Sequence, residues 1–180
     1  MKKQIPVNGL VYLICMISAC LLNLLVSALA VRILEVFIEP SFYAVAIVRI
    51  IAGVAMSCFI LGAVLWYEGY KSVSFSLSTV LLSVSLAAAV HFVLALVFKF
   101  HPFIACGTRY LGGFIEMGGD FVSYEGVGDV RLWAYIVAFA VLKILELIVA
   151  PICAYVGMRA RLKSRETIDG YKKSSDITDD

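Results

Sequence analysis

Four long apolar runs, at residues 10–31, 43–67, 73–98 and 132–158, dominate the sequence and limit what it can fold into. A helix of about 20 apolar residues, rising 1.5 Å per residue, crosses the roughly 30 Å hydrocarbon layer of a membrane. Lipid offers no partner to an unpaired backbone N–H or C=O, so each run must be a helix. The sequence therefore predicts an all-α integral membrane protein, with residues 1–158 forming one four-helix bundle domain.

The basic residues indicate how these helices are oriented. Hydrophobic residues make up 62% of the chain and charged residues only 16%, so the position of each charge carries weight. Basic side chains precede the first run, lie between the second and third, and follow the fourth, whereas the other two connections are net acidic. Because cytoplasmic loops carry an excess of Lys and Arg, we expect both termini in the cytoplasm, the plasma membrane as the location, and residues 99–131 as a long extracytoplasmic loop.

The two ends of the chain admit further interpretations. Lys2 and Lys3, followed by an apolar run with small residues at Ala28 and Ala30, resemble a cleaved secretory signal. Signal cores are about 7–15 residues long, shorter than this run, so we expect the first helix to be retained, with cleavage after Ala30 as the alternative. Residues 159–180 are basic and then acidic, and we expect them to form a flexible cytoplasmic tail.

Each apolar run carries a stripe of small residues at intervals of four, and each stripe includes a strongly polar residue. This spacing places the stripe on one helix face, and small residues let helices approach closely in lipid. We expect the stripes to line the interior of a compact bundle, although small residues are frequent enough in membrane helices to align by chance. The stripes are Cys15, Ala19, Asn23 and Ser27; Arg49, Gly53 and Ser57; Thr79, Ser83, Ala87, His91 and Ala95; and Ala134, Ala138, Leu142, Glu146, Ala150 and Ala154.

Lys143 and Glu146 lie near the middle of the fourth run. A charge at the bilayer centre costs roughly 2.5–3.5 kcal/mol on insertion scales. Three helical positions separate the two side chains by about 60°, which allows them to pair. Two interpretations follow: a neutral ion pair that fixes helix packing, or a glutamate that titrates or binds a cation.

Other polar residues fall nearer the extracytoplasmic side. Glu35 is at the end of the first helix and Arg49 lies six residues into the second, so we expect them to form a cross-helix ion pair. With His91 they are also candidates for an external vestibule that leads toward Glu146. A lone histidine is more often a packing residue than a proton carrier. Asn23 is the polar member of the first stripe.

The loop at residues 99–131 has a pattern of its own. Its apolar residues recur at spacings of four and seven between Pro102 and Gly118, which predicts a short amphipathic helix at the outer membrane interface, either a lid, a docking surface or a lipid-facing connector. Asp120, Glu125 and Asp129 lack the spacing of a metal-binding loop, and we expect them to be solvated.

Motifs of known enzymes do not occur: the chain has no G-x-S-x-G, H-E-x-x-H, P-loop or C-x-x-C sequence. We therefore expect no catalytic residues, no cofactor and no metal. The favoured function is a non-catalytic subunit or scaffold for other membrane proteins. The alternative is a small channel or transporter component that moves protons or cations through the buried polar residues. The expected partners are membrane lipids and other membrane proteins or further copies of the chain, and not nucleic acid. The candidate residues are Asn23, Glu35, Arg49, His91, Lys143 and Glu146.

Overall fold

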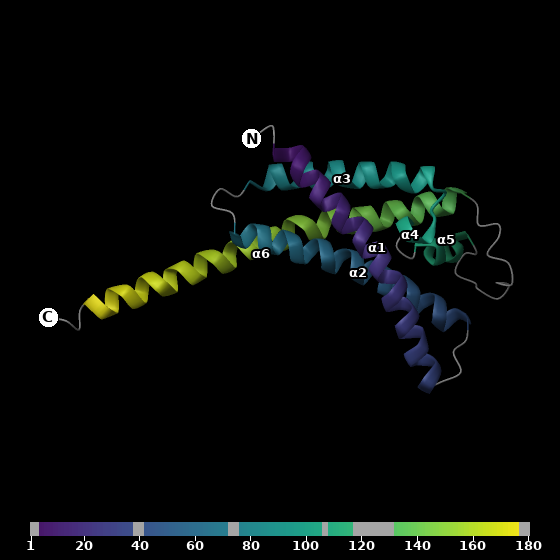
Figure 1. Cartoon of the computed structure of the whole chain (residues 1–180), viewed down its shortest axis with the longest axis horizontal. Coiled ribbons are helices and arrows are strands. Elements are labelled where there is room, and N and C mark those ends of the chain that lie inside the picture. Colours follow the sequence, from purple (N-terminus) through teal and green to yellow (C-terminus); the bar gives the residue numbers. More distant parts are fainter. Residues whose placement is uncertain (1–3, 38–41, 72–75, 106–107, 117–131, 177–180) are drawn as a thin grey trace.

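The described residues form helices and contain no strand in the computed structural model, which describes residues 4–37, 42–71, 76–105, 108–116 and 132–176 (Figure 1). Four helices are long and apolar enough to cross a membrane. The chain is a multi-pass membrane protein, and the prediction of an all-α four-helix bundle is confirmed. The helices are α1 (Gln4–Phe37), α2 (Phe42–Lys71), α3 (Leu77–Val97), α4 (Pro102–Ala105), α5 (Thr108–Glu116) and α6 (Leu132–Asp176).

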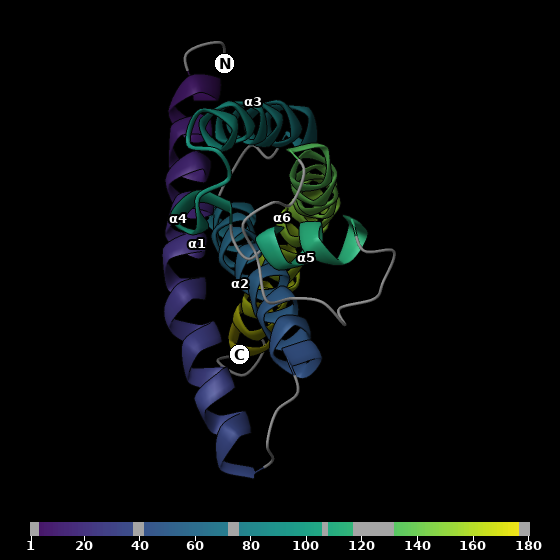
Figure 2. The same cartoon turned by 90° about the vertical axis from the view of Figure 1, so that its right-hand side faces the viewer.

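The four long helices pack as a ring. Helix α1 contacts α2 and α3, and α6 contacts the same two helices from the opposite side of the bundle (Figure 2). Helices α1 and α3 run in one direction and α2 and α6 in the other (Figure 1), so α2 and α6 are parallel neighbours. Both termini lie beyond one end of the bundle, here called the terminus end, and α4 and α5 lie at the other, the loop end.

The small-residue stripes line the bundle interior, as predicted. Most of their members are buried, including all six on α6, while Cys15, Arg49 and Thr79 are half-buried. Large apolar side chains instead cover the outer surface, for example Leu25, Phe59 and Val93. A water-soluble protein of this size would bury such residues, whereas in a membrane they contact the acyl chains.

The backbones of α2 and α6 touch where the two helices cross near the terminus end. A Cβ atom added to Gly69 would stand 2.1 Å from the carbonyl oxygen of Ala154, and one added to Gly157 would stand 2.0 Å from that of Trp66. Only glycine fits at such distances, because its hydrogen points at the facing carbonyl where other residues carry carbon. We call these four residues the glycine crossing.

Helix α3 ends in a turn that sends the chain back into the bundle. The amide of Phe100 donates to the carbonyl oxygen of Ala95 at 2.7 Å, and that of Lys99 to Leu96 at 3.0 Å, the two bonds of a Schellman motif. Lys99 has φ 49° at the position where glycine is usual. Phe100 is buried and stacks on Tyr135, so its packing holds the turn in place.

The loop helix differs from the prediction. The described residues contain two short helices where one was predicted: α4 packs against α1 and α3, and α5 packs against α6 and α2. The sequence pattern located an apolar helical segment but not its contacts, since the same apolar face fits lipid or protein.

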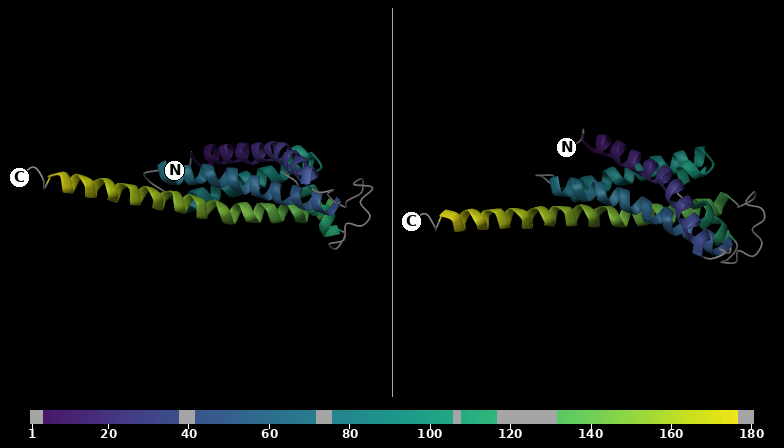
Figure 3. Two further views of the ribbon diagram at one scale, coloured as in Figure 1. Left: turned by 90° about the horizontal axis from the view of Figure 1, so that it is seen from below. Right: turned by 60° about the horizontal axis from the view of Figure 1, so that its bottom comes forward.

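Helix α6 extends well past the terminus end of the other helices (Figure 3). We expected the membrane helix to stop at Met158 and a flexible tail to follow, but the helix continues to Asp176. Residues 159–166 are mostly good helix formers, and an existing helix extends without a new nucleation cost. The expectation rested on charge, which marks the membrane boundary and not the end of a helix.

Candidate functional site

The predicted ion pair is present in the middle of the bundle. Lys143 Nζ donates to Glu146 Oε2 at 2.7 Å. Glu146 is 0% exposed and Lys143 is 6% exposed. The hydroxyl of Ser57, on α2, donates to the other carboxylate oxygen, Oε1. Both oxygens of the buried carboxylate therefore have a donor, which is the condition for burying a charge at acceptable cost.

His91 joins this pair from α3. Lys143 Nζ lies 2.8 Å from His91 Nδ1, and because an ammonium group can only donate, Nδ1 accepts. The ring hydrogen is then on Nε2, which donates to the backbone carbonyl oxygen of Ile104 at 3.0 Å. The imidazole is thus neutral, and the group of Ser57, His91, Lys143 and Glu146, which we call the central cluster, carries no net charge.

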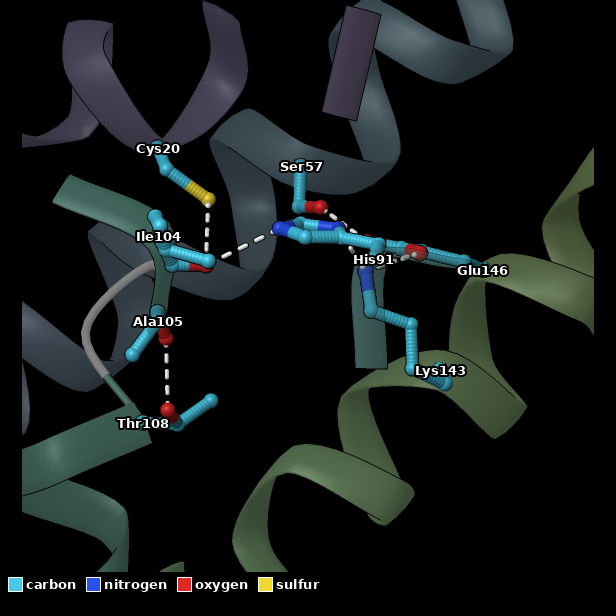
Figure 4. A network of polar contacts seen from close by, with 8 residues as sticks. All are labelled: Cys20, Ser57, His91, Ile104, Ala105, Thr108, Lys143 and Glu146. Carbon is cyan, nitrogen blue, oxygen red and sulfur yellow. Dashed lines mark hydrogen bonds and ion pairs between the residues drawn. The ribbon is translucent and has the colours of Figure 1, made fainter. Parts of the chain in front are cut away.

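The Ile104 carbonyl connects the central cluster to α4. It accepts from His91 and also from Cys20 Sγ on α1 at 3.3 Å (Figure 4). The next carbonyl, that of Ala105, accepts from the hydroxyl of Thr108 at 2.5 Å. A four-residue helix leaves its carbonyls without partners within the helix, and side chains supply those partners here. These hydrogen bonds hold α4 against the bundle at its loop end.

Apolar side chains separate the central cluster from both ends of the bundle. Toward the loop end, the Phe139 ring lies edge-on to His91, with 5.2 Å between ring centroids, and 4.8 Å from Lys143 Nζ. Toward the terminus end, Leu61 and Leu65 follow Ser57 along α2 and pack with Tyr12, among other residues, in one buried apolar group. The charges are enclosed in this conformation.

Two polar contacts near the ends of the bundle involve residues that the sequence did not single out. Tyr12, on α1, is fully buried, and its hydroxyl donates to Glu68 Oε2 on α2. Arg49 donates through Nη1 to the hydroxyl of Tyr110 on α5, and its guanidinium lies 5.0 Å from the centroid of that ring. Tyrosine is enriched at membrane–water interfaces, so neither Tyr12 nor Tyr110 stood out from the pattern.

The predicted pairing of Glu35 with Arg49 is wrong. Glu35 instead accepts from Arg32 Nη1 at 2.8 Å on its own helix, where both side chains are exposed. Arg49 contacts α5 because that helix packs against α2. His91, the third residue of the predicted external vestibule, donates to the Ile104 carbonyl oxygen on α4, and the vestibule itself stays a prediction. Residue spacing predicts where each charged residue lies along its helix, but not which neighbouring helix its side chain faces.

Asn23 lies in the interior, as expected, and is 2% exposed. Its Oδ1 atom and the Nε atom of Arg49 are the buried side-chain atoms without a hydrogen-bond partner in the described part of the chain. The described part of the chain contains no group of three or more His, Cys, Asp or Glu side chains that could hold a metal ion. Asp120, Glu125 and Asp129 lie outside the described residues.

Of the six candidate residues, the structure brings His91, Lys143 and Glu146 into direct contact and leaves Asn23, Glu35 and Arg49 apart from them in its hydrogen bonds. Ser57 completes the cluster; it was part of the second stripe but was not selected as a site residue. Comparison with known proteins adds no relative: no family model, no curated protein and no solved structure matches the chain.

Proposed function

We propose that the protein is a non-catalytic subunit or scaffold that associates with other membrane proteins or with further copies of itself. The observation that carries the proposal is the completeness of the central cluster. Both oxygens of Glu146 and both nitrogens of His91 have partners from this chain, and apolar side chains enclose them. A buried polar cluster whose carboxylate and imidazole atoms all have hydrogen-bond partners within the chain serves to fix helix packing.

The surface of the molecule also supports an associating role. Helix α6 extends beyond the bundle as a single helical arm (Figure 3), and α5 lies against α2 and α6 at the opposite end. These two elements are the surfaces that we propose a partner contacts.

Affinity purification in mild detergent, followed by mass spectrometry, tests this proposal. A subunit should be recovered with one membrane protein, or with itself, at a fixed ratio that crosslinking before extraction preserves. A variant truncated after Met158 lacks the arm and serves as the matched comparison. Recovery of the protein as a lone monomer, both with and without crosslinking, would contradict the proposal.

We further propose that the membrane is the plasma membrane and that both termini lie in the cytoplasm. The support is the excess of Lys and Arg at the terminus end. Fusion of a fluorescent protein to the C-terminus should give fluorescence, because such reporters fold in the cytoplasm, whereas an alkaline phosphatase fusion at the same place should be inactive. The opposite pair of results would reverse the orientation.

A second candidate function is proton or cation movement, favoured by one specific observation. Glu146, Lys143 and His91 form an unbroken series of hydrogen-bonded titratable groups in the membrane interior, and intramembrane ionisable residues often mark ion pathways. Liposomes that contain the purified protein should then show proton or cation flux, which Glu146→Gln abolishes while the fold persists. Absence of flux from a folded parent protein would remove this candidate.

A further inference from the structure

Aromatic and basic side chains surround α2 and α6 at the terminus end. On α2, Trp66 stacks on Tyr70 with 5.5 Å between ring centroids, and Lys71 Nζ lies 5.9 Å from the centroid of the Tyr67 ring. On α6, Arg159 Nε donates to the hydroxyl of Tyr155 at 2.8 Å, and its guanidinium lies 5.5 Å from the centroid of that ring. We call this set of six residues the collar.

The glycine crossing holds both halves of the collar at one height. Gly69 touches the backbone of Ala154, and Gly157 touches that of Trp66, so neither helix can slide past the other. Helices α2 and α6 run in the same direction, and Lys71 and Arg159 each follow a glycine of the crossing by two residues. Both basic residues therefore lie just beyond this contact, toward the terminus end. Tyrosine and tryptophan rings sit at the level of lipid headgroups in membranes, which places the two cations in the headgroup layer.

The chemistry of the collar matches a phosphate. Lys71 and Arg159 are exposed. The bond to Tyr155 uses one of the five N–H groups of the Arg159 guanidinium and fixes the orientation of its plane. A guanidinium fixed in this way suits the oxygens of a phosphate diester. The acidic residue nearest in the α2 sequence, Glu68, is half-buried and bound to Tyr12, so it is turned toward the bundle interior.

We propose that the collar binds the headgroups of anionic phospholipids in the leaflet at the terminus end. Lipid is favoured over an acidic protein because the aromatic rings fix the collar at headgroup depth, where lipid phosphates are always adjacent. The glycine crossing makes the collar specific to this end of α2 and α6, since it brings two basic residues from different helices to the same level.

The two tryptophans of the chain provide a built-in measurement. Trp66 belongs to the collar, while Trp133 is in the first turn of α6 at the loop end, and both side chains are partly exposed. Trp133→Phe leaves a reporter only at the collar, and Trp66→Phe leaves a reporter only at the loop end. Quenching by brominated phosphatidylglycerol, compared with brominated phosphatidylcholine in mixed liposomes, then gives the relative affinity of each region for the anionic lipid.

Brominated phosphatidylglycerol should quench Trp66 more strongly than brominated phosphatidylcholine does, which we call a preference for the anionic lipid. Trp133 should show little preference. Each basic residue near an anionic surface contributes roughly fivefold, so Lys71→Gln and Arg159→Gln should each lower the preference by about that factor, and the double variant should remove most of it. Lys71→Arg keeps the charge and should keep the preference. Lys99→Gln, which removes an exposed lysine at the loop end, is the matched control and should leave the Trp66 result unchanged.

Two results would overturn the proposal: an equal preference at both reporters, or an unchanged preference at Trp66 in the folded double variant. A salt titration of the protein that carries only Trp133→Phe keeps the test decisive if the double variant does not fold. The preference should then decline steadily as salt screens the charges. A preference at Trp66 that ignores salt would show that charge does not cause it.

Discussion

The central cluster and the glycine crossing hold the same two helices, α2 and α6, by opposite means. In the central cluster, Ser57 on α2 reaches across to Glu146 on α6 by hydrogen bonding, and Lys143 neutralises the carboxylate. At the glycine crossing no side chain intervenes, and the backbones of Gly69 and Gly157 lie directly against the facing helix. One contact depends on charge and the other on the absence of a carbon atom.

This difference determines which substitutions each of the two contacts can tolerate. The hydrophobic effect does not drive helices together in lipid, so α2 and α6 need either polar bonds or very close packing. A polar contact fails when one partner is removed, because the other remains buried and unpaired. A close-packed contact fails when an atom is added. Three variants can separate the two behaviours, and a fourth, in the turn after α3, gives the scale of a contact outside both regions.

The largest effect should come from breaking the ion pair on one side only. Lys143→Met leaves the Glu146 carboxylate buried with Ser57 as its remaining donor. Breaking a buried pair in this way costs about 3–5 kcal/mol in soluble proteins. Thermal unfolding in detergent, followed by circular dichroism, should show a strongly lowered melting temperature. Lys99→Met removes an exposed lysine and should melt like the parent.

The next largest effect should come from adding a methyl group at the glycine crossing. Gly157→Ala would place its Cβ against a backbone oxygen that cannot rotate away, so α2 and α6 must separate. Overpacking of this kind costs roughly 1–3 kcal/mol. Gly9→Ala is the matched comparison, because its Cβ would stand 3.4 Å from the carbonyl oxygen of Ser83. That variant should be neutral or more stable, since alanine is the better helix former. Equal melting temperatures for the two variants would mean that the crossing is loosely packed.

A smaller loss is expected when α4 is detached from the central cluster. His91→Leu removes the donor to the Ile104 carbonyl and one acceptor of Lys143, while the ion pair itself remains. Each of these two lost hydrogen bonds costs about 1 kcal/mol, since Cys20 still donates to the carbonyl and Glu146 still accepts from Lys143. Hydrogen exchange of the α4 amides should accelerate in this variant. If those amides exchange as in the parent, His91 does not hold α4.

The smallest effect should be a gain. Lys99→Gly places glycine at a position with φ 49°, where it removes a backbone strain of about 1 kcal/mol. Lys99→Ala keeps the strain and serves as the control. The glycine variant should melt slightly higher than the alanine variant, and the reverse order would contradict the assigned turn.

The sequence predicted those features that depend on position within one helix. The number of membrane-spanning helices, the buried stripes and the pairing of Lys143 with Glu146 all follow from patterns along a single helix, and the structure confirms them. Features that depend on how one helix is rotated against another were missed. The contact of His91 with Lys143 and the loss of the Glu35–Arg49 pair belong to that class.

Gly69 and Gly157 illustrate the same limit. Gly53 stood out because it falls on a stripe with Arg49, and it is buried as predicted. Gly157 falls on no such stripe. Gly69 continues the four-residue series of Arg49, Gly53 and Ser57, but two leucines interrupt its run of small residues. A stripe repeats every four residues, whereas two crossing helices touch at one point. Single contacts of this kind leave no period in the sequence.

The most direct test of the central claim, that the charges serve packing, is to compare Lys143→Met with the double variant Lys143→Met, Glu146→Leu in the same melting experiment. The double variant removes both charges, so it should recover much of the stability that the single variant loses. Recovery should be incomplete, because Ser57 and His91 each lose a hydrogen-bond partner. A double variant less stable than the single one, or a Lys143→Met variant as stable as the parent, would contradict the account.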